Sequence, residues 1–181
     1  MSVPITRTLL LLAQGLGLGR LHPGPGTWGS LGGVLLTAAL LLVPYPAFYV
    51  AAVLILVAAS IPICSAAEKA LGETDPGSVV LDEIVAVPIA FSGYAAHWWA
   101  VGATPRLGGI SQWWPALLVA FVLFRIFDIW KPWPIGWVDQ NVMGGLGVML
   151  DDYVAGLLAA LLLYAASLMW WIGPASTPTA S

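Results

Sequence analysis

Long uncharged stretches alternate with short charged ones along the chain, and this pattern predicts membrane-spanning helices. The stretch between Arg20 and Glu68 has 47 positions without an acidic residue, lysine or arginine, and the stretch after Asp152 has 29. A helix needs about 20 apolar residues to cross the hydrocarbon core of a bilayer. The first stretch therefore predicts two helices, separated by the turn-forming sequence Val43-Pro44-Tyr45-Pro46. Uncharged runs on both sides of Arg106 predict two more.

We therefore expect an all-α integral membrane protein with about five transmembrane helices. The apolar segment Thr8–Gly19 has only 12 residues, so we expect a short N-terminal helix that is interfacial or re-entrant. A cleaved signal peptide is the alternative for this segment. Residues 1–172 are expected to form one membrane-embedded domain, and residues 173–181 a disordered tail. The spans are expected near Leu31–Val43, Ala47–Ala67, Ile84–Val101, Trp113–Ile129 and Val148–Ile172.

The composition supports a membrane protein. Hydrophobic residues make up 60% of the 181 residues and charged residues 8%, whereas soluble domains carry about 25% charged residues. The net charge of −3, with only six basic residues, argues against nucleic acid as a partner. The single cysteine, Cys64, excludes an internal disulfide and lies in an apolar run, so we expect a small buried hydrophobic residue there.

The two ends of the predicted helices differ in charge. When five helices are threaded through a bilayer, all nine acidic residues and five of the six basic residues lie on one side, and Arg106 lies on the other. The positive-inside rule makes the charged side cytoplasmic. Tryptophans mark the span ends on both sides, as an aromatic belt requires: Trp98-Trp99, Trp113-Trp114 and Trp170-Trp171 on the far side, and Trp130, Trp133 and Trp137 on the charged side.

Acidic pairs at the ends of predicted spans are the first candidates for chemistry. Asp82 and Glu83 open the third span, and Asp151 and Asp152 lie at the start of the fifth. Carboxylates also favour helix N-termini through the helix dipole, which is the simpler alternative. Ionisable groups at this depth are costly, however, and usually serve a function. Their oxygen atoms are the ligands that Mg²⁺ prefers, so the pairs indicate a divalent cation.

Bases and glycines near these acids indicate an anionic substrate. Arg125 and Asp128 share a helix face, and Lys131 follows at a Pro132 break. A local ion pair with a snorkelling lysine is one alternative, but a phosphate group explains an arginine inside a span. Gly144–Gly147 leave backbone N–H groups free to face an anion, although a flexible loop and a capped helix are also possible.

A segment rich in glycine and proline, residues 22–30, predicts a tight and irregular backbone path. Such a path at membrane depth is tolerated only where it is buried or lines a wet cavity. Thr27 and Ser30 offer hydroxyl groups in this segment.

These motifs together resemble the phosphatidylglycerophosphatase A family of bacterial membrane phosphatases. Four blocks in family order carry the resemblance: Pro25-Gly-Thr-Trp-Gly-Ser30, Asp75 through Asp82-Glu83, Arg125-x-x-Asp128-x-x-Lys131-Pro-x-Pro134, and Gly144-Gly-x-Gly147-x-x-x-Asp151-Asp152-x-x-Ala155-Gly156. The resemblance implies a Mg²⁺-dependent hydrolase that removes the terminal phosphate of phosphatidylglycerophosphate, giving phosphatidylglycerol in phospholipid biosynthesis. It also implies a multi-pass protein of the bacterial inner membrane with its site on the cytoplasmic side.

The resemblance implies roles for individual residues as well. The candidate metal ligands are Asp75, Asp82, Glu83, Asp151 and Asp152. The candidate catalytic residues are Asp82, Glu83, Asp128 and Asp152. The phosphate is expected to contact Thr27, Arg125, Lys131 and the backbone of Gly144, Gly145 and Gly147. Whether water or a carboxylate attacks phosphorus is left open, although the absence of a D-x-D nucleophile motif favours water.

Two functions of other classes remain as alternatives. An ion-coupled transporter would use the acidic residues as its cation site, and discontinuous helices with Gly and Pro breaks fit such a protein. A carrier holds its site near the bilayer midplane, however, where the threading places no acidic residue. A non-catalytic scaffold that binds anionic lipid would need a basic cluster, whereas acidic residues outnumber basic ones here.

Overall fold

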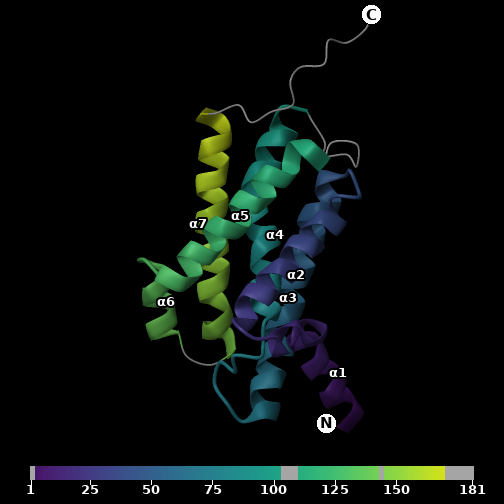
Figure 1. The fold of residues 1–181 in the computed structure, drawn as a ribbon, viewed down its shortest axis with the longest axis vertical. Helices are drawn as coiled ribbons and strands as arrows, with labels where there is room; N and C mark the ends of the chain where they lie inside the picture. The colour runs from purple at the N-terminus through teal and green to yellow at the C-terminus, as the bar shows by residue number, and fades with distance from the viewer. Residues whose placement is uncertain (1–2, 103–109, 143–144, 170–181) are drawn as a thin grey trace, which may run out of the picture.

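The computed structural model describes residues 3–102, 110–142 and 145–169. Within these ranges all regular secondary structure is helical and no strand forms (Figure 1), which confirms the predicted all-α class. The elements in chain order are α1 (Val3–Ala13), the 3₁₀ helix η1 (Gly15–Arg20), α2 (Pro25–Leu40), α3 (Pro46–Leu71), α4 (Leu81–Ala100), α5 (Ile110–Trp130), α6 (Ile135–Asn141) and α7 (Gly145–Met169).

Each predicted span overlaps a helix, but the count of five spans is not confirmed. Among the residues that the structure describes, three stretches are long and apolar enough to cross a membrane: Pro46–Leu71, Trp113–Trp130 and Met149–Met169. Helix α2 has 16 residues, which is short against the roughly 20 that a span needs. Helix α4 has 20 residues but begins with two carboxylates and carries His97 near its end.

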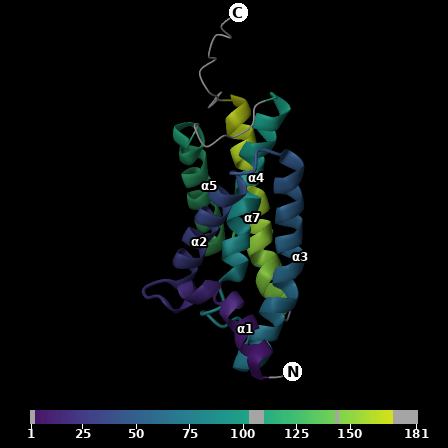
Figure 2. The ribbon, with the colours of Figure 1, turned by 90° about the vertical axis from the view of Figure 1, so that its right-hand side faces the viewer.

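Helix α4 lies inside the bundle, with the other long helices packed around it (Figures 1 and 2). Its most extensive contact is with α7, and it also contacts α2, α3 and α5. Nearly all of its side chains between Ile84 and Trp98 are buried. A helix that is apolar on all sides is typically enclosed by protein. The polar residues of α4 therefore face other helices.

Glycines allow the backbones of α4 and α7 to touch. A Cβ atom added at Gly93 would lie 1.9 Å from the carbonyl oxygen of Ala160. One added at Gly156 would lie 2.9 Å from the carbonyl oxygen of Ala86. Close approach at small residues is typical of helix packing in membranes. This contact fixes the distance between the first turns of α4 and α7.

We expect Gly93→Ala to destabilise the folded protein, because its methyl group would collide with backbone at Ala160. Overpacking of this kind costs about 1–3 kcal/mol. The midpoint of thermal unfolding in detergent should fall by roughly 5 °C or more. Gly77→Ala is the control, since a Cβ atom there meets nothing within 4 Å. Equal midpoints for the two variants would contradict the close α4–α7 contact.

One end of the bundle collects the acidic residues. The first turns of α2, α4 and α7 lie there, together with the last turns of α3 and α5 and the whole of α6 (Figure 1). Acidic residues occupy the last turn of α3, the α3–α4 loop, the start of α4, the end of α5, α6 and the start of α7. This end is called the charged end below.

Three local predictions need correction. A short N-terminal helix is present as α1, but the segment Thr8–Gly19 covers only its end and most of η1, and the backbone inside η1 is left-handed at Leu16 and Gly17. The irregular path predicted for residues 22–30 ends at Pro25, because proline is well suited to the first position of a helix and α2 starts there. The segment between the last two predicted spans contains the further helix α6.

Only some of the tryptophans predicted to form a belt are exposed. Trp130, Trp133 and Trp137 are exposed near the charged end, as membrane anchors should be. At the opposite end Trp114 is exposed, whereas Trp98 and Trp113 are buried in the bundle. Trp170-Trp171 and the predicted tail lie outside the described residues. Cys64 is buried, as expected.

Candidate active site

Three carboxylates from two helices meet at the charged end. Asp82 and Glu83 lie in the first turn of α4, and Asp152 lies about two turns from the start of α7. One carboxylate oxygen of each lies within 4.8 Å of those of the other two. The contact between Ala86 and Gly156, one turn further along each helix, holds these positions together. We refer to Asp82, Glu83 and Asp152 as the carboxylate cluster.

The carboxylate cluster fits a divalent cation. Asp82 and Asp152 are only 4% and 6% exposed, so little water screens the repulsion between the negative charges. Oxygen Oε2 of Glu83 is buried and has no hydrogen-bond partner among the described residues, which is rare for a native acceptor. Hard divalent cations take carboxylate oxygens as ligands. A bound cation would both neutralise the cluster and satisfy the orphaned oxygen.

The other two predicted metal ligands, Asp75 and Asp151, do not belong to the carboxylate cluster. Lys131 Nζ donates to Asp151 Oδ2 at 2.7 Å, so Asp151 faces the lysine although it adjoins Asp152. Asp75 is exposed in the α3–α4 loop, and its backbone N–H donates to Glu68 Oε1 at 3.2 Å. The structure thus assembles three of the five predicted ligands.

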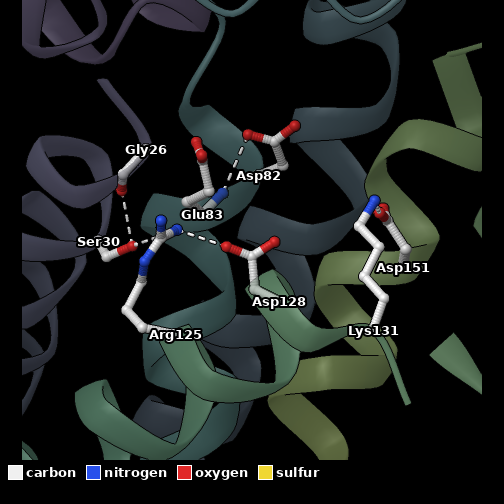
Figure 3. Close-up of polar contacts among 8 residues, drawn as sticks. All are labelled: Gly26, Ser30, Asp82, Glu83, Arg125, Asp128, Lys131 and Asp151. Carbon is white, nitrogen blue, oxygen red and sulfur yellow. Dashed lines mark hydrogen bonds and ion pairs between the residues drawn. The ribbon is translucent and has the colours of Figure 1, made fainter. Parts of the chain in front are cut away.

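Arg125 extends from α5 toward α2 and α4 (Figure 3). Its Nη1 donates to Asp128 Oδ2 at 2.5 Å and makes a longer contact of 3.5 Å with Ser30 Oγ. The Ser30 hydroxyl in turn donates to the Gly26 carbonyl at 2.7 Å. Arg125 and Asp128 share one helix face, as predicted, and they form the local ion pair that the sequence left open as an alternative. The guanidinium is therefore anchored from two helices.

Glycines of α2 bring that helix against the carboxylate cluster. A Cβ atom added at Gly26 would lie 2.2 Å from Glu83 Oε1 and 3.2 Å from Arg125 Nη1. One added at Gly29 would lie 3.2 Å from Glu83 Oε2. Both the arginine and the carboxylate thus occupy the space that a side chain at Gly26 would fill. A side chain at this position would displace one of the two groups.

Ser30, which was not among the predicted site residues, supplies the hydroxyl that contacts Arg125, whereas Thr27 was expected to contact the phosphate. Thr27 is exposed, whereas Ser30 is fully buried. Positions 26, 29, 30 and 33 share one face of a helix. This spacing is present in the sequence, but it indicates a shared face only if Pro25 is taken as the start of a helix.

Lys131 links α6 to α7. Its Nζ donates to Asp139 Oδ1 at 2.5 Å. It also donates to Asp151 Oδ2, toward which it extends (Figure 3). Burial opposes the charge on the ammonium group, but the hydrogen bonds to both carboxylates outweigh it and raise the pKa of Lys131 above its usual range. Lys131 therefore stays charged, with its charge balanced by protein carboxylates. Arg125 is the positively charged side chain adjacent to the carboxylate cluster.

The predicted glycine-rich phosphate loop is described in part. Gly144 lies outside the described residues. Gly145 is the first residue of α7, and Gly147 lies in its first turn. A Cβ atom at Gly147 would lie 1.7 Å from the Val142 carbonyl oxygen. The chain leaving α6 therefore folds closely against the start of α7.

The chain is similar in sequence to bacterial phospholipid phosphatases. The family model described as Phosphatidylglycerophosphatase A matches residues 11–167. The chain is 36% identical over 163 residues to phosphatidylglycerophosphatase A of Escherichia coli, covering 90% of this chain and 86% of the relative. It is 33% identical over 171 residues to phosphatidylglycerophosphatase A of Haemophilus influenzae, covering 94% of each. No solved structure matches the chain.

Proposed function

The chain belongs to the phosphatidylglycerophosphatase A family, and on this premise we propose that it hydrolyses the terminal phosphomonoester of phosphatidylglycerophosphate. The product is phosphatidylglycerol, so the reaction serves phospholipid biosynthesis. Membership makes the protein a phosphoric monoester hydrolase. The observation that carries the proposal is the buried carboxylate cluster beside Arg125, at one end of a bundle with three membrane-compatible helices.

Asp82, Glu83 and Asp152 would hold Mg²⁺ in this proposal. The three carboxylates supply hard oxygen ligands, and burial excludes competing water. When bound, such an ion offsets negative charge on phosphoryl oxygens and lowers the pKa of a water molecule.

Arg125 binds the phosphate in the proposed mechanism. Within the described residues, its contacts to Asp128 and Ser30 engage Nη1 alone, so Nε and Nη2 can donate to phosphoryl oxygens. A planar guanidinium matches two such oxygens at once. Its fixed charge then stabilises the transition state, in which negative charge is spread over the phosphoryl group.

Asp128 is the proposed general base, because the carboxylates of the cluster would serve as ligands. The oxygen of a water molecule forms a bond to phosphorus while Asp128 takes its proton. The bond between phosphorus and the glycerol oxygen breaks, and the leaving oxygen accepts the proton that Asp128 took from the water. Inorganic phosphate and the lipid alcohol are the products.

We place the charged end at the cytoplasmic face of the bacterial inner membrane, in a multi-pass protein. The positive-inside rule supports this orientation, because most of the basic residues belong to elements at that end: Arg7, Arg20, Lys69, Arg125 and Lys131. The ion-coupled transporter is not favoured, because the carboxylate cluster lies near the starts of α4 and α7 rather than at mid-helix.

Phosphate release tests the proposed function. We expect protein purified in detergent to release inorganic phosphate from phosphatidylglycerophosphate, and EDTA to lower the rate at least about 100-fold because the cluster cannot act without its ion. Excess Mg²⁺ should restore the rate. The rate of phosphate release from phosphatidic acid, a monoester without the second glycerol, should be compared with that from phosphatidylglycerophosphate to determine the headgroup preference. The absence of release with Mg²⁺ present contradicts the proposed reaction, and release that persists in EDTA contradicts the metal.

A further inference from the structure

Helices α3, α4 and α7 contact one another along one side of the bundle (Figure 2). A groove lies between these three helices. Its volume is about 360 Å³, which is in the range of ligand pockets. Val50, Leu54 and Leu157 at its edge are between 48% and 63% exposed, so the groove opens outward. The lining residues come from all three helices: Tyr49, Val50, Val53, Leu54, Val57, Ile89, Ser92, Tyr153 and Leu157.

The groove offers no free polar group to a ligand. Each of its three hydroxyl-bearing residues is hydrogen-bonded within the protein. The Tyr49 hydroxyl donates to the Pro88 carbonyl at 2.8 Å, and Ser92 donates to the Ile89 carbonyl at 2.6 Å. The Tyr153 hydroxyl lies 2.5 Å from Ser60 Oγ. With its hydroxyls satisfied, the groove suits hydrocarbon and gives a polar ligand nothing to bind.

The groove is continuous with the elements that form the carboxylate cluster. Tyr153 directly follows Asp152 in α7. Ile89 lies seven residues after Asp82 in α4, about 10 Å along the helix. From there the groove extends toward Tyr49, near the opposite end of the bundle, and its α3 wall runs for about 12 Å. The groove thus leads away from the charged end, along two helices apolar enough to span a membrane.

We propose that this groove binds one acyl chain of the glycerophospholipid substrate, and we call it the acyl groove. The inference rests on the proposed function and adds a position for the hydrocarbon. A headgroup at the carboxylate cluster would direct its chains into the bilayer, which is the direction the acyl groove takes. Lipid tails are as apolar as its lining, so entry brings no hydrophobic gain. The acyl groove therefore acts through shape, by orienting the lipid relative to Arg125 and the carboxylate cluster.

Filling the acyl groove should selectively reduce the rate of hydrolysis of long-chain substrates. Val53→Trp places an indole in it, and we expect kcat/KM for a dioleoyl substrate to fall about tenfold while that for a dihexanoyl substrate stays unchanged. Ile55→Trp is the matched control, because Ile55 is 67% exposed on the same helix and does not line the groove. Leu54→Trp, at the exposed edge, repeats the test if Val53→Trp fails to fold.

A photoreactive acyl chain provides a readout independent of turnover. A phosphatidylglycerophosphate analogue with a diazirine in one chain should label residues 49–57 or 153–157 of the parent protein, and Val53→Trp should remove this labelling. The proposal that the groove binds an acyl chain is overturned if Val53→Trp leaves the labelling unchanged or lowers kcat/KM equally for both chain lengths. A parent protein that releases phosphate from neither substrate overturns the proposed function instead.

Discussion

Asp152→Asn is expected to lower phosphate release at least about 100-fold while the protein remains folded. Asparagine has nearly the same shape as aspartate, but it offers one neutral oxygen in place of a charged carboxylate. Asp152 is the only α7 residue in the carboxylate cluster described here, so its loss leaves a cation with ligands from α4 alone. The rate should be measured with saturating Mg²⁺ and phosphatidylglycerophosphate in detergent.

The thermal stability of the same variant separates metal binding from folding. Without metal, Asp152→Asn should unfold at a higher temperature than the parent, because one of three crowded carboxylates is removed. Mg²⁺ should raise the midpoint of the parent and raise that of the variant much less. Glu73→Gln is the control, since Glu73 is an exposed carboxylate at the charged end outside the cluster. Normal turnover, or a Mg²⁺-induced shift equal to that of the parent, would rule out Asp152 as a ligand.

Arg125→Ala is expected to reduce kcat/KM by about 100- to 1000-fold. A Cβ atom at Gly26 would contact both Arg125 and Glu83, so the guanidinium lies beside the carboxylate cluster, where we propose that it binds the phosphate. Arg125→Lys should recover only part of the loss, because an ammonium group cannot bind two phosphoryl oxygens through a planar fork. The measurement is the dependence of the initial rate on substrate concentration at saturating Mg²⁺.

Stability distinguishes phosphate binding from a structural role for Arg125. Its ion pair with Asp128 is only 17% exposed on each side, so Arg125→Ala leaves a largely buried carboxylate unpaired and should lower the midpoint of thermal unfolding. Arg125→Lys keeps a cation beside Asp128, so its midpoint should recover although its kcat/KM recovers only in part. Lys69→Ala is the matched control, because Lys69 is an exposed base near the end of α3. An unchanged kcat/KM would show that Arg125 only anchors Asp128 and Ser30.

The sequence predicted the features of the site that depend on spacing within one helix. Arg125 and Asp128 are three residues apart and lie on one helix face, as predicted, where they form an ion pair. Which of two adjacent acids faces the cluster could not be predicted this way. Asp151 and Asp152 point about 100° apart on α7, and the choice between them depends on how α7 is rotated against α4. That rotation is set by the backbone contacts at Gly93 and Gly156.

The position of Lys131 depended on an element that the hydrophobic pattern did not predict. Helix α6 has only seven residues and follows Pro134, so it produces no clear helical periodicity. It nevertheless supplies Asp139, which binds Lys131 together with Asp151. The resemblance implied that Lys131 would contact a phosphate, whereas the structure pairs it with these two carboxylates.

The backbone contact between α4 and α7 also gives the parts of the site different mechanical properties. All three carboxylates of the cluster come from these two helices, so a bilayer that tilts or compresses the bundle moves the carboxylates as one unit. Arg125 comes from α5 and reaches the other helices through its side chain. A change in membrane thickness should therefore alter the distance from guanidinium to cation more than the coordination of the cation itself.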